Sequence, residues 1–290
     1  MGLDRGVTAD LVDLPALRSY LVAHAVPGLD EVLLSTDGSS VHRRLVVVDG
    51  AEPVLLTVAL PSGDVGSPTI TVDGSGDDVG PVLATGRRWV GLDADPAPGV
   101  AALAGDPVLG PLVVSRPHLR VPGSTDAFET AVLVVLGQHV SLAAGRVFAA
   151  RLVAAHGDHL STQLGQLRVF PGPQVLAGLD GVDLQRTVGI TGARARTVVA
   201  IAREVADGNA PLASRDALLA LPGVGPWTAD LVALRALRDP DVFLPGDLVL
   251  RKALGGLPAA RAAAMAEAWS PHRSLAVLHL WTHHAIDPPR

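Results

Sequence analysis

The segment 221–254 reads LPGVGPWTADLVALRALRDPDVFLPGDLVLRKAL, and it decides how the rest of the sequence is interpreted. Gly223 and Gly225 flank a valine, a helical pattern starts at Pro226, and a lone aspartate, Asp247, follows a second Pro-Gly pair. Proline is favoured in the first turn of a helix, and glycine is favoured just beyond the end of one. The segment therefore predicts a helix, a tight hairpin and a second helix.

Glycines in such a hairpin leave backbone N–H groups uncovered where the second helix begins. Uncovered N–H groups at a helix start hold a phosphate oxygen without reading the base sequence. Two interpretations stay open on this motif alone. The hairpin either binds phosphate or is an ordinary connection whose glycines only end a helix.

Length and composition limit the classes of protein to consider. A chain of 290 residues suggests two or three structural units. It has no cysteine, which excludes disulfides, thiolate zinc sites, cysteine nucleophiles and cysteine-held iron–sulfur clusters. The first residues lack a signal-peptide pattern, and no run reaches the ~20 apolar residues of a membrane span. We expect a cytoplasmic protein that does not enter a membrane.

Charge is distributed unevenly along the chain. The formal net charge is −6, yet residues 1–115 carry 6 basic and 15 acidic residues, whereas residues 116–290 carry 17 basic and 14 acidic ones. The acidity belongs to the first part. The net charge of +3 in the second part is too small to indicate nucleic-acid binding by itself.

Apolar periodicity predicts an α+β protein. The first third has a helical pattern over 13–26 and then β-branched runs, which predict strands over 40–50, 53–60 and 68–74. The segment 73–81 is predicted as a loop, because its Gly-x-Gly lacks the rest of a dinucleotide fingerprint, and 93–99 as a joint. Beyond about residue 100 only helices are predicted. They cover 126–135 (with Asp126 and Glu129 as a capping pair), a stretch from Ser141 onward, 175–180, 183–188, 192–207, 214–220, 226–238, 247–254, 258–268 and 272–285.

The combination of LPGVGPWTA with FLPGD resembles the helix-hairpin-helix superfamily of base-excision DNA glycosylases. Two more segments narrow the resemblance to the 3-methyladenine DNA glycosylase II family: RPHLRVPGSTDAFETAVLVVLGQHVS (116–141) and WSPHRSLAVLHLW (269–281). The resemblance implies an N-terminal antiparallel sheet domain with helices over 1–97, followed by two all-helical domains around a cleft. One comprises 122–239 with the helix-hairpin-helix motif, and the other comprises 98–121 and 240–290.

The resemblance implies that Asp247 is the catalytic carboxylate. Cleavage of an N-glycosidic bond builds positive charge on the sugar, and a nearby carboxylate stabilises that state or positions water. The same residue is also a good N-cap for the helix that follows it, and the two roles are compatible. The lyase members of the superfamily have a lysine where this chain has Trp227, and Lys252 is its only lysine. We therefore expect base release without strand cleavage.

The family's base pocket is lined by aromatic rings, and this sequence departs from that pattern. Trp227 and Trp281 match the family's tryptophans, and Gln138 is expected beside them. Leu231, Leu248 and Thr282 occupy positions where the well-studied type has tyrosine. Since Tyr20 is the only tyrosine, no cage of that kind can form. Fewer rings weaken the attraction for cationic bases, which favours a shift toward neutral lesions such as hypoxanthine.

The wedge residue and the cation site also come from the resemblance. His139, in LGQHVS, takes the place of the wedge that fills the gap left by a flipped base, where the family commonly has an apolar or amide side chain. The phosphate-binding hairpin comprises Gly223, Val224, Gly225 and Thr228. A structural Na⁺ or K⁺ is expected on the backbone carbonyls of Leu219, Leu221 and Val224.

Arg194 and Arg196 are expected to be solvent-exposed, with phosphate contact as the alternative. His272, His279, His283 and His284 are not expected to form a zinc or other transition-metal site.

The sequence thus predicts a monomeric, monofunctional glycosylase that releases alkylated purines (3-methyladenine and 7-methylguanine) from damaged double-stranded DNA and needs no catalytic cofactor. Two alternatives stay open. One is a helix-hairpin-helix protein that binds DNA without catalysis, and the other is a glycosylase for a neutral or otherwise different lesion.

Overall fold

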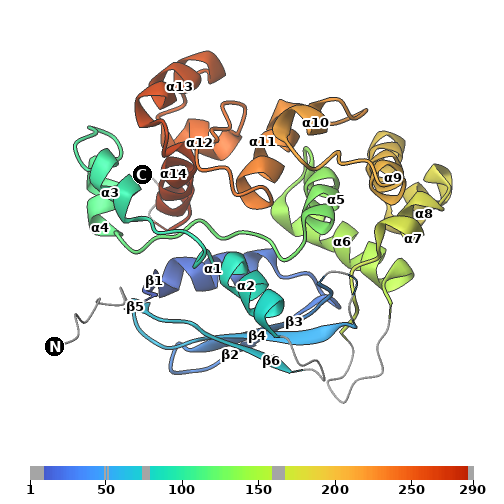
Figure 1. The fold of residues 1–290 in the computed structure, drawn as a ribbon. Coiled ribbons are helices and arrows are strands. Elements are labelled where there is room, and N and C mark those ends of the chain that lie inside the picture. Colours follow the sequence, from blue (N-terminus) through green and yellow to red (C-terminus); the bar gives the residue numbers. More distant parts are fainter. Residues whose placement is uncertain (1–9, 49, 51, 74–78, 159–166, 287–290) are drawn as a thin grey trace.

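The computed structural model describes residues 10–48, 50, 52–73, 79–158 and 167–286. An antiparallel sheet lies at one side of the molecule, and two groups of helices lie above it with helices α1 and α2 between (Figure 1). The predicted α+β class is confirmed.

The main sheet has the strand order β2-β3-β4-β6, and its strands are antiparallel. Its members are Asp30–Leu34 (β2), Ser40–Val46 (β3), Val54–Leu60 (β4) and Thr69–Asp73 (β6). A second, two-stranded pair joins Val12–Asp13 (β1) to Val65–Gly66 (β5). In β4, Leu56, Val58 and Leu60 are buried and share an apolar cluster with Leu14 of α1 and Trp89 of α2. The sheet therefore packs one face against these two helices.

The three predicted strands are confirmed with trimmed ends, but six of the described elements of this region were not predicted. They are the strands β1, β2 and β5 and the helices α2 (Gly80–Trp89), α3 (Ala97–Leu103) and α4 (Gly110–Ser115). α2 overlaps the end of the predicted loop, and α3 overlaps the predicted joint. For α2 and α3 the physical cause is the same: the Gly80-Pro81 and Ala97-Pro98 pairs favour a loop and a joint, although proline in the first turn starts both helices.

The regular structure of the described residues beyond α2 is entirely helical, as predicted. The helices are Ala127–Gly137 (α5), Leu142–His156 (α6), Pro173–Ala177 (α7), Gly181–Val188 (α8), Gly192–Ala206 (α9), Arg215–Leu219 (α10), Pro226–Arg235 (α11), Leu248–Ala253 (α12), Ala259–Ala266 (α13) and Arg273–Ile286 (α14), with a 3₁₀ turn at Glu267–Trp269. The first helix, α1, spans Leu14–His24. The predicted capping pair is real, because Asp126 accepts a hydrogen bond from the Glu129 backbone N–H.

Two buried apolar clusters organise these helices. One unites α5 to α10 with Ala229 and Val232 of α11, and the other unites α3, α4, α12, α13 and α14 with Ala233 and Leu234 of α11. Helix α11 therefore belongs to both cores and lies between the two groups of helices (Figure 1).

A buried ion pair fixes the sheet against the helices. Arg44 of β3 donates from Nη2 to both carboxylate oxygens of Glu129 on α5 at 2.7 Å and lies 3.6 Å from Asp30. Burial raises the pKa of Glu129, and the guanidinium beside it opposes that rise. Breaking such a pair leaves an uncompensated buried charge, which costs about 3–5 kcal/mol. None of the described helices is long and apolar enough to cross a membrane.

Candidate active site and DNA interface

Asp247 receives three N–H donors. It is the N-cap of α12, where its Oδ1 accepts from the Leu250 backbone N–H at 2.9 Å. Trp281 Nε1 donates to Oδ1 at 3.2 Å, and Trp227 Nε1 donates to Oδ2 at 3.1 Å. The cap role is therefore confirmed, and two indoles from separate helices fix the orientation of the carboxylate. The sequence-predicted trio of Asp247, Trp227 and Trp281 comes together at one point.

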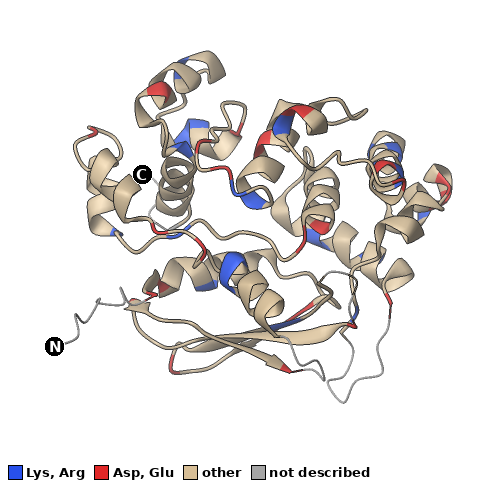
Figure 2. Cartoon of the chain, viewed as in Figure 1, with Lys and Arg blue, Asp and Glu red and all other residues tan. Residues whose placement is uncertain are grey.

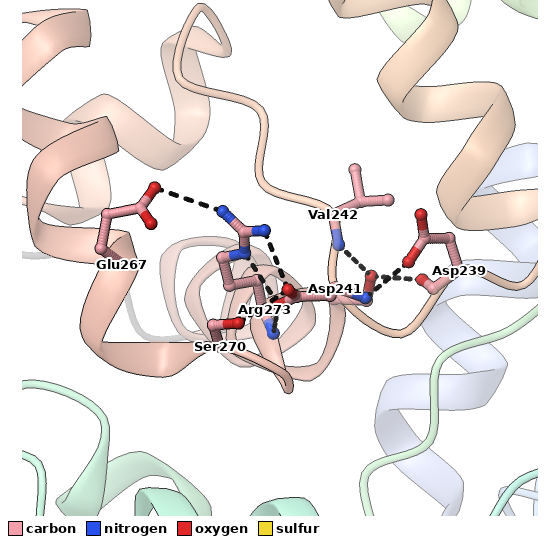
Figure 3. A network of polar contacts seen from close by, with 7 residues as sticks. Asp239, Asp241, Val242, Glu267, Ser270 and Arg273 are labelled. Atoms are coloured by element: carbon pink, nitrogen blue, oxygen red, sulfur yellow. Dashed lines mark hydrogen bonds and ion pairs between the residues drawn. The ribbon is translucent and has the colours of Figure 1, made fainter. Parts of the chain in front are cut away.

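The loop that leads to Asp247 is anchored to the start of α14 by a polar network (Figure 3). Arg273 donates to both carboxylate oxygens of Asp241 at 2.7 and 2.9 Å. The Ser274 hydroxyl donates to the Asp239 carbonyl and accepts from the Val242 backbone N–H. Since the same helix carries Trp281, this network ties the carboxylate and its indole partner to one rigid element.

Asp247 and its two indole partners line a cavity of ≈ 1320 Å³ at the junction of the sheet domain and both helical groups. The predicted pocket residues all line it, namely Trp227, Trp281, Leu231, Leu248, Gln138 and Thr282. Leu231 is half-buried against the second core, whereas Leu248 is exposed. Around Asp247 the pocket therefore has largely apolar walls and a carboxylate, the form usual for small-ligand sites.

Two residues of the wall beside Trp281 were missed at the sequence level. Tyr20 of α1 lines the cavity, and the guanidinium carbon of Arg235 lies 4.6 Å from the centre of its ring and 5.3 Å from that of Trp281. The only tyrosine thus supplies an aromatic ring to the cavity, which was not expected. Tyr20 precedes Trp281 by some 260 positions in the sequence, so only tertiary structure brings them together.

The hairpin between α10 and α11 requires only one of its two glycines. Gly223 has φ +81, and a Cβ there would lie 1.9 Å from the Thr197 Oγ1 of α9. Gly225 has φ −93 and open space around it. Backbone freedom is therefore needed only at Gly223, whereas the lack of a side chain at Gly225 leaves the start of α11 uncovered.

Four backbone N–H groups of this hairpin, in the described part of the chain, have no protein acceptor. They are those of Gly223, Gly225, Trp227 and Thr228. The Thr228 side chain itself is buried, and its Oγ1 accepts from Gln138 Nε2 at 2.9 Å. Thr228 can therefore meet a phosphate only through its backbone, and Gln138 both lines the cavity and holds the hairpin.

His139 lies in the break between α5 and α6. It is exposed, lines the mouth of the cavity and has φ +54, a left-handed conformation that non-glycine residues rarely adopt. Such strain of about 1–3 kcal/mol is concentrated at functional sites. Arg194 is half-buried and donates to the carbonyl of Gln138, the residue before His139, whereas Arg196 is exposed as predicted.

The carbonyls expected to bind a monovalent cation are partly engaged. Leu221 O accepts from Val224 N at 3.2 Å, while those of Leu219 and Val224 accept no hydrogen bond from described residues. Oxygen-only donors of this kind suit Na⁺ or K⁺. No cluster of three or more His, Asp or Glu in the described ranges has a geometry that could hold a metal ion.

Charged residues of both signs are spread over the helical part of the molecule. Acidic and basic residues alternate over the helices in Figure 2. Lys252 is exposed on α12, and its ammonium group has no hydrogen bond or ion pair to another described residue.

Comparison with known structures places this geometry in the helix-hairpin-helix DNA glycosylase fold. A 3-methyladenine DNA glycosylase from Archaeoglobus fulgidus matches with a TM-score of 0.79, covering 95% of this chain and 96% of the other at 20% identity. An 8-oxoguanine glycosylase/lyase from Clostridium acetobutylicum, solved with double-stranded DNA, matches with a TM-score of 0.69, 15% identity and coverage of 88% and 87%.

Sequence relatives define the family within that fold. Residues 11–126 match the family described as the AlkA N-terminal domain. A probable bifunctional transcriptional activator/DNA repair enzyme AlkA of Mycobacterium tuberculosis is 40% identical over 91% of this chain, and DNA-3-methyladenine glycosylase 2 of Escherichia coli is 37% identical over 60% of it. The chain spans 53% and 63% of the length of these two relatives. The chain belongs to the 3-methyladenine DNA glycosylase II (AlkA) family.

Proposed function

We propose that the protein is a DNA glycosylase that hydrolytically releases alkylated purines, of the 3-methyladenine and 7-methylguanine type, from duplex DNA. The observation that carries the proposal is the carboxylate of Asp247 held by two indole N–H groups at a largely apolar cavity. The names of the relatives in DNA repair support the same reaction class.

Asp247 is proposed as the catalytic residue. When the bond between base and sugar C1′ breaks, its electron pair leaves with the base and the sugar becomes oxocarbenium-like. A fixed carboxylate stabilises that positive charge, and water then adds its hydroxide to C1′ and delivers its proton to solvent or base. Alkylation at N3 or N7 makes the purine a good leaving group, so little general-acid help is required.

The reaction is proposed to stop at base release. A lyase step needs an amine that attacks C1′ to form a Schiff base. Trp227 occupies the position where the lyases of the superfamily have that lysine. Lys252 lies on the exposed surface of α12 and does not line the cavity.

Duplex binding is assigned to the hairpin and to His139. The free N–H groups at 223–228 are arranged to receive one phosphate, and a cation on the Leu219, Leu221 and Val224 carbonyls would stiffen the hairpin and add positive charge beside that phosphate. His139, exposed and fixed in a left-handed conformation, is proposed as the wedge that fills the gap of the flipped nucleotide. We expect the protein to act as a monomer in the cytoplasm.

Base release from methylated duplex DNA tests the proposal, with the wild type assayed beside Asp247→Asn and product strands inspected before alkali treatment. We expect methylpurine release by the wild type, unbroken strands, and a loss of at least about 100-fold in the variant, as for removal of an electrostatic stabiliser. Asparagine keeps the N-cap, so a melting temperature near that of the wild type separates chemistry from folding. Equal release by both proteins would remove Asp247 from its role. Intact duplex binding without release of methylpurines or hypoxanthine would favour the binding-only alternative.

A further inference from the structure

Arg235 is a buried cation with no carboxylate partner in the described part of the chain. Its relative exposure is 8%, and it lines the cavity. Among the described residues the only hydrogen bond of its guanidinium runs from Nη1 to the Pro122 carbonyl at 2.8 Å, and no carboxylate lies within ion-pair distance. Its other neighbours are the faces of the Tyr20 and Trp281 rings. Burial lowers the pKa of the group, which nevertheless stays protonated, because an arginine in a protein does not lose its proton.

Arg238, one turn further along the chain, shows what a purely structural arginine looks like here. It donates to the neighbouring Val121 carbonyl at 2.9 Å, just as Arg235 donates to Pro122. In contrast to Arg235, it also forms a paired contact with both carboxylate oxygens of Asp93. Tethering the 121–122 segment therefore does not require an unpaired charge. The lack of a counter-ion beside Arg235, among the residues that the structure describes, leaves its field directed at the cavity.

The other arginines of the cavity wall differ from Arg235 because each has a carboxylate within electrostatic range. They are Arg44 (with Glu129), Arg120 (with Asp10) and Arg146 (with Asp30). An opposite charge at such a distance offsets much of the field of a guanidinium. Arg235 is therefore the cation of the wall whose charge is least compensated.

The histidine beside Tyr20 adds no positive charge to this field at neutral pH. The ring of His24 stacks on Tyr20 with centroids 4.1 Å apart, and its Nδ1–H donates to the Tyr20 carbonyl. Partial desolvation, and then repulsion by Arg235, lowers the pKa of His24, although the side chain is exposed to the cavity, so this ring is neutral at pH 7.

The position of Arg235 has a consequence for any base stacked on Trp281. The guanidinium occupies one face of the indole, so a base can stack only on the other. A base about 3.5 Å beyond that face would lie about 9 Å from the guanidinium carbon. At that distance, across a low-dielectric wall, two positive charges repel each other, whereas a neutral base is unaffected. In addition, Arg235 already makes a cation–π contact with the Trp281 ring, which weakens the attraction of that ring for a second cation.

We propose that Arg235 is a specificity-determining residue that lowers the preference of the pocket for cationic bases relative to neutral ones of the same size. The inference rests on the proposed glycosylase function. The residue does not touch the reacting atoms and acts through the charge that it places behind Trp281.

The test compares single-turnover release of a cationic substrate, 7-methylguanine, with release of a neutral one, hypoxanthine, from matched duplexes. Arg235→Met removes the charge and keeps the length, and Arg235→Gln also keeps a donor for the Pro122 carbonyl in case the methionine variant does not fold. Arg235→Lys keeps the charge. Arg238→Met is the matched control, because it removes an arginine whose charge Asp93 already neutralises.

We expect the ratio of 7-methylguanine to hypoxanthine release to rise about tenfold in the methionine and glutamine variants, by removal of a like charge about 9 Å away. The lysine variant and Arg238→Met should keep the wild-type ratio. A ratio unchanged in the folded uncharged variants, or raised equally by lysine, would overturn the inference while leaving the glycosylase function intact. If the wild type released neither base, the proposed function itself would fail, and the two failures are thus distinguishable.

Discussion

The hairpin glycine at 223 permits a prediction whose magnitude follows from coordinates. In Gly223→Ala, the new Cβ would lie 1.9 Å from Thr197 Oγ1 and 3.2 Å from Thr197 Cβ. The backbone would also keep φ +81, a conformation that costs about 1–2 kcal/mol for a residue with a side chain. Thr197 is 4% exposed and its hydroxyl donates to the Ala193 carbonyl, so it cannot swing aside. Overpacking of this kind adds about 1–3 kcal/mol, and the expected loss of unfolding free energy is therefore about 3 kcal/mol.

Gly225→Ala is the matched control. Its φ is −93, and no atom lies within 4 Å of the position that a Cβ would take. The unfolding free energy should therefore change by no more than about 0.5 kcal/mol, because the lower entropy of the unfolded chain offsets the poorer N-cap. Thr197→Ala combined with Gly223→Ala removes Oγ1 and should recover the steric part of the loss, leaving the φ cost of about 1–2 kcal/mol.

Urea denaturation monitored by circular dichroism measures all four proteins, and fluorescence anisotropy with a labelled duplex measures their DNA binding. The Gly223→Ala hairpin must shift away from α9, so duplex affinity should fall as well. If Gly223→Ala proved no less stable than Gly225→Ala, or if the double substitution recovered nothing, the contact with Thr197 would not be what makes glycine necessary at 223.

Two further predictions concern histidines. His139→Gly relieves the left-handed conformation at φ +54, so unfolding free energy should be retained or rise by about 1 kcal/mol while base release in a single-turnover assay falls; full activity would argue against the wedge role. His279 is 2% exposed, and burial, followed by repulsion from Arg116, lowers its pKa to about 4. Because this pKa lies below that of the unfolded chain, the unfolded chain binds the extra proton first. The folded state therefore loses stability as the pH falls from about 6.5 to 4. Urea titrations at pH 7.5 and pH 5 measure how much unfolding free energy each protein loses on acidification. We expect this loss to be about 2 kcal/mol smaller in His279→Leu than in the wild type. An equal loss in both proteins would mean that this histidine is not what makes the fold acid-sensitive.

Local chemistry explains which features the sequence could predict. Asp247 and Trp227 lie within one contiguous segment whose glycines, prolines and caps are themselves structural signals, and the hairpin emerged from those signals. Helix α2 was missed because a Gly-Pro pair favours a turn as much as a first helical turn. The contact between Thr197 and Gly223 could not be predicted from the sequence for a different reason, because it exists only when α9 packs against the hairpin.

Arg235 lies between these two cases, because a signal for it is present in the sequence. Trp227, Leu231 and Arg235 are spaced by four residues, and positions four apart lie on one face of a helix. All three line the cavity, whereas Ala229 and Val232 on the opposite side of α11 are fully buried in the first core. The helix thus begins at the proposed phosphate-binding hairpin, carries the indole that orients Asp247, and ends at the unpaired guanidinium. Helix α11 is ten residues long, or about 15 Å, and packs into both helical cores. It therefore forms a rigid element that fixes the distances between the proposed phosphate contact, the Asp247 carboxylate and the Arg235 guanidinium. Substitutions that tilt α11 should therefore change DNA binding, base release and base preference together, whereas Arg235→Met should change preference alone.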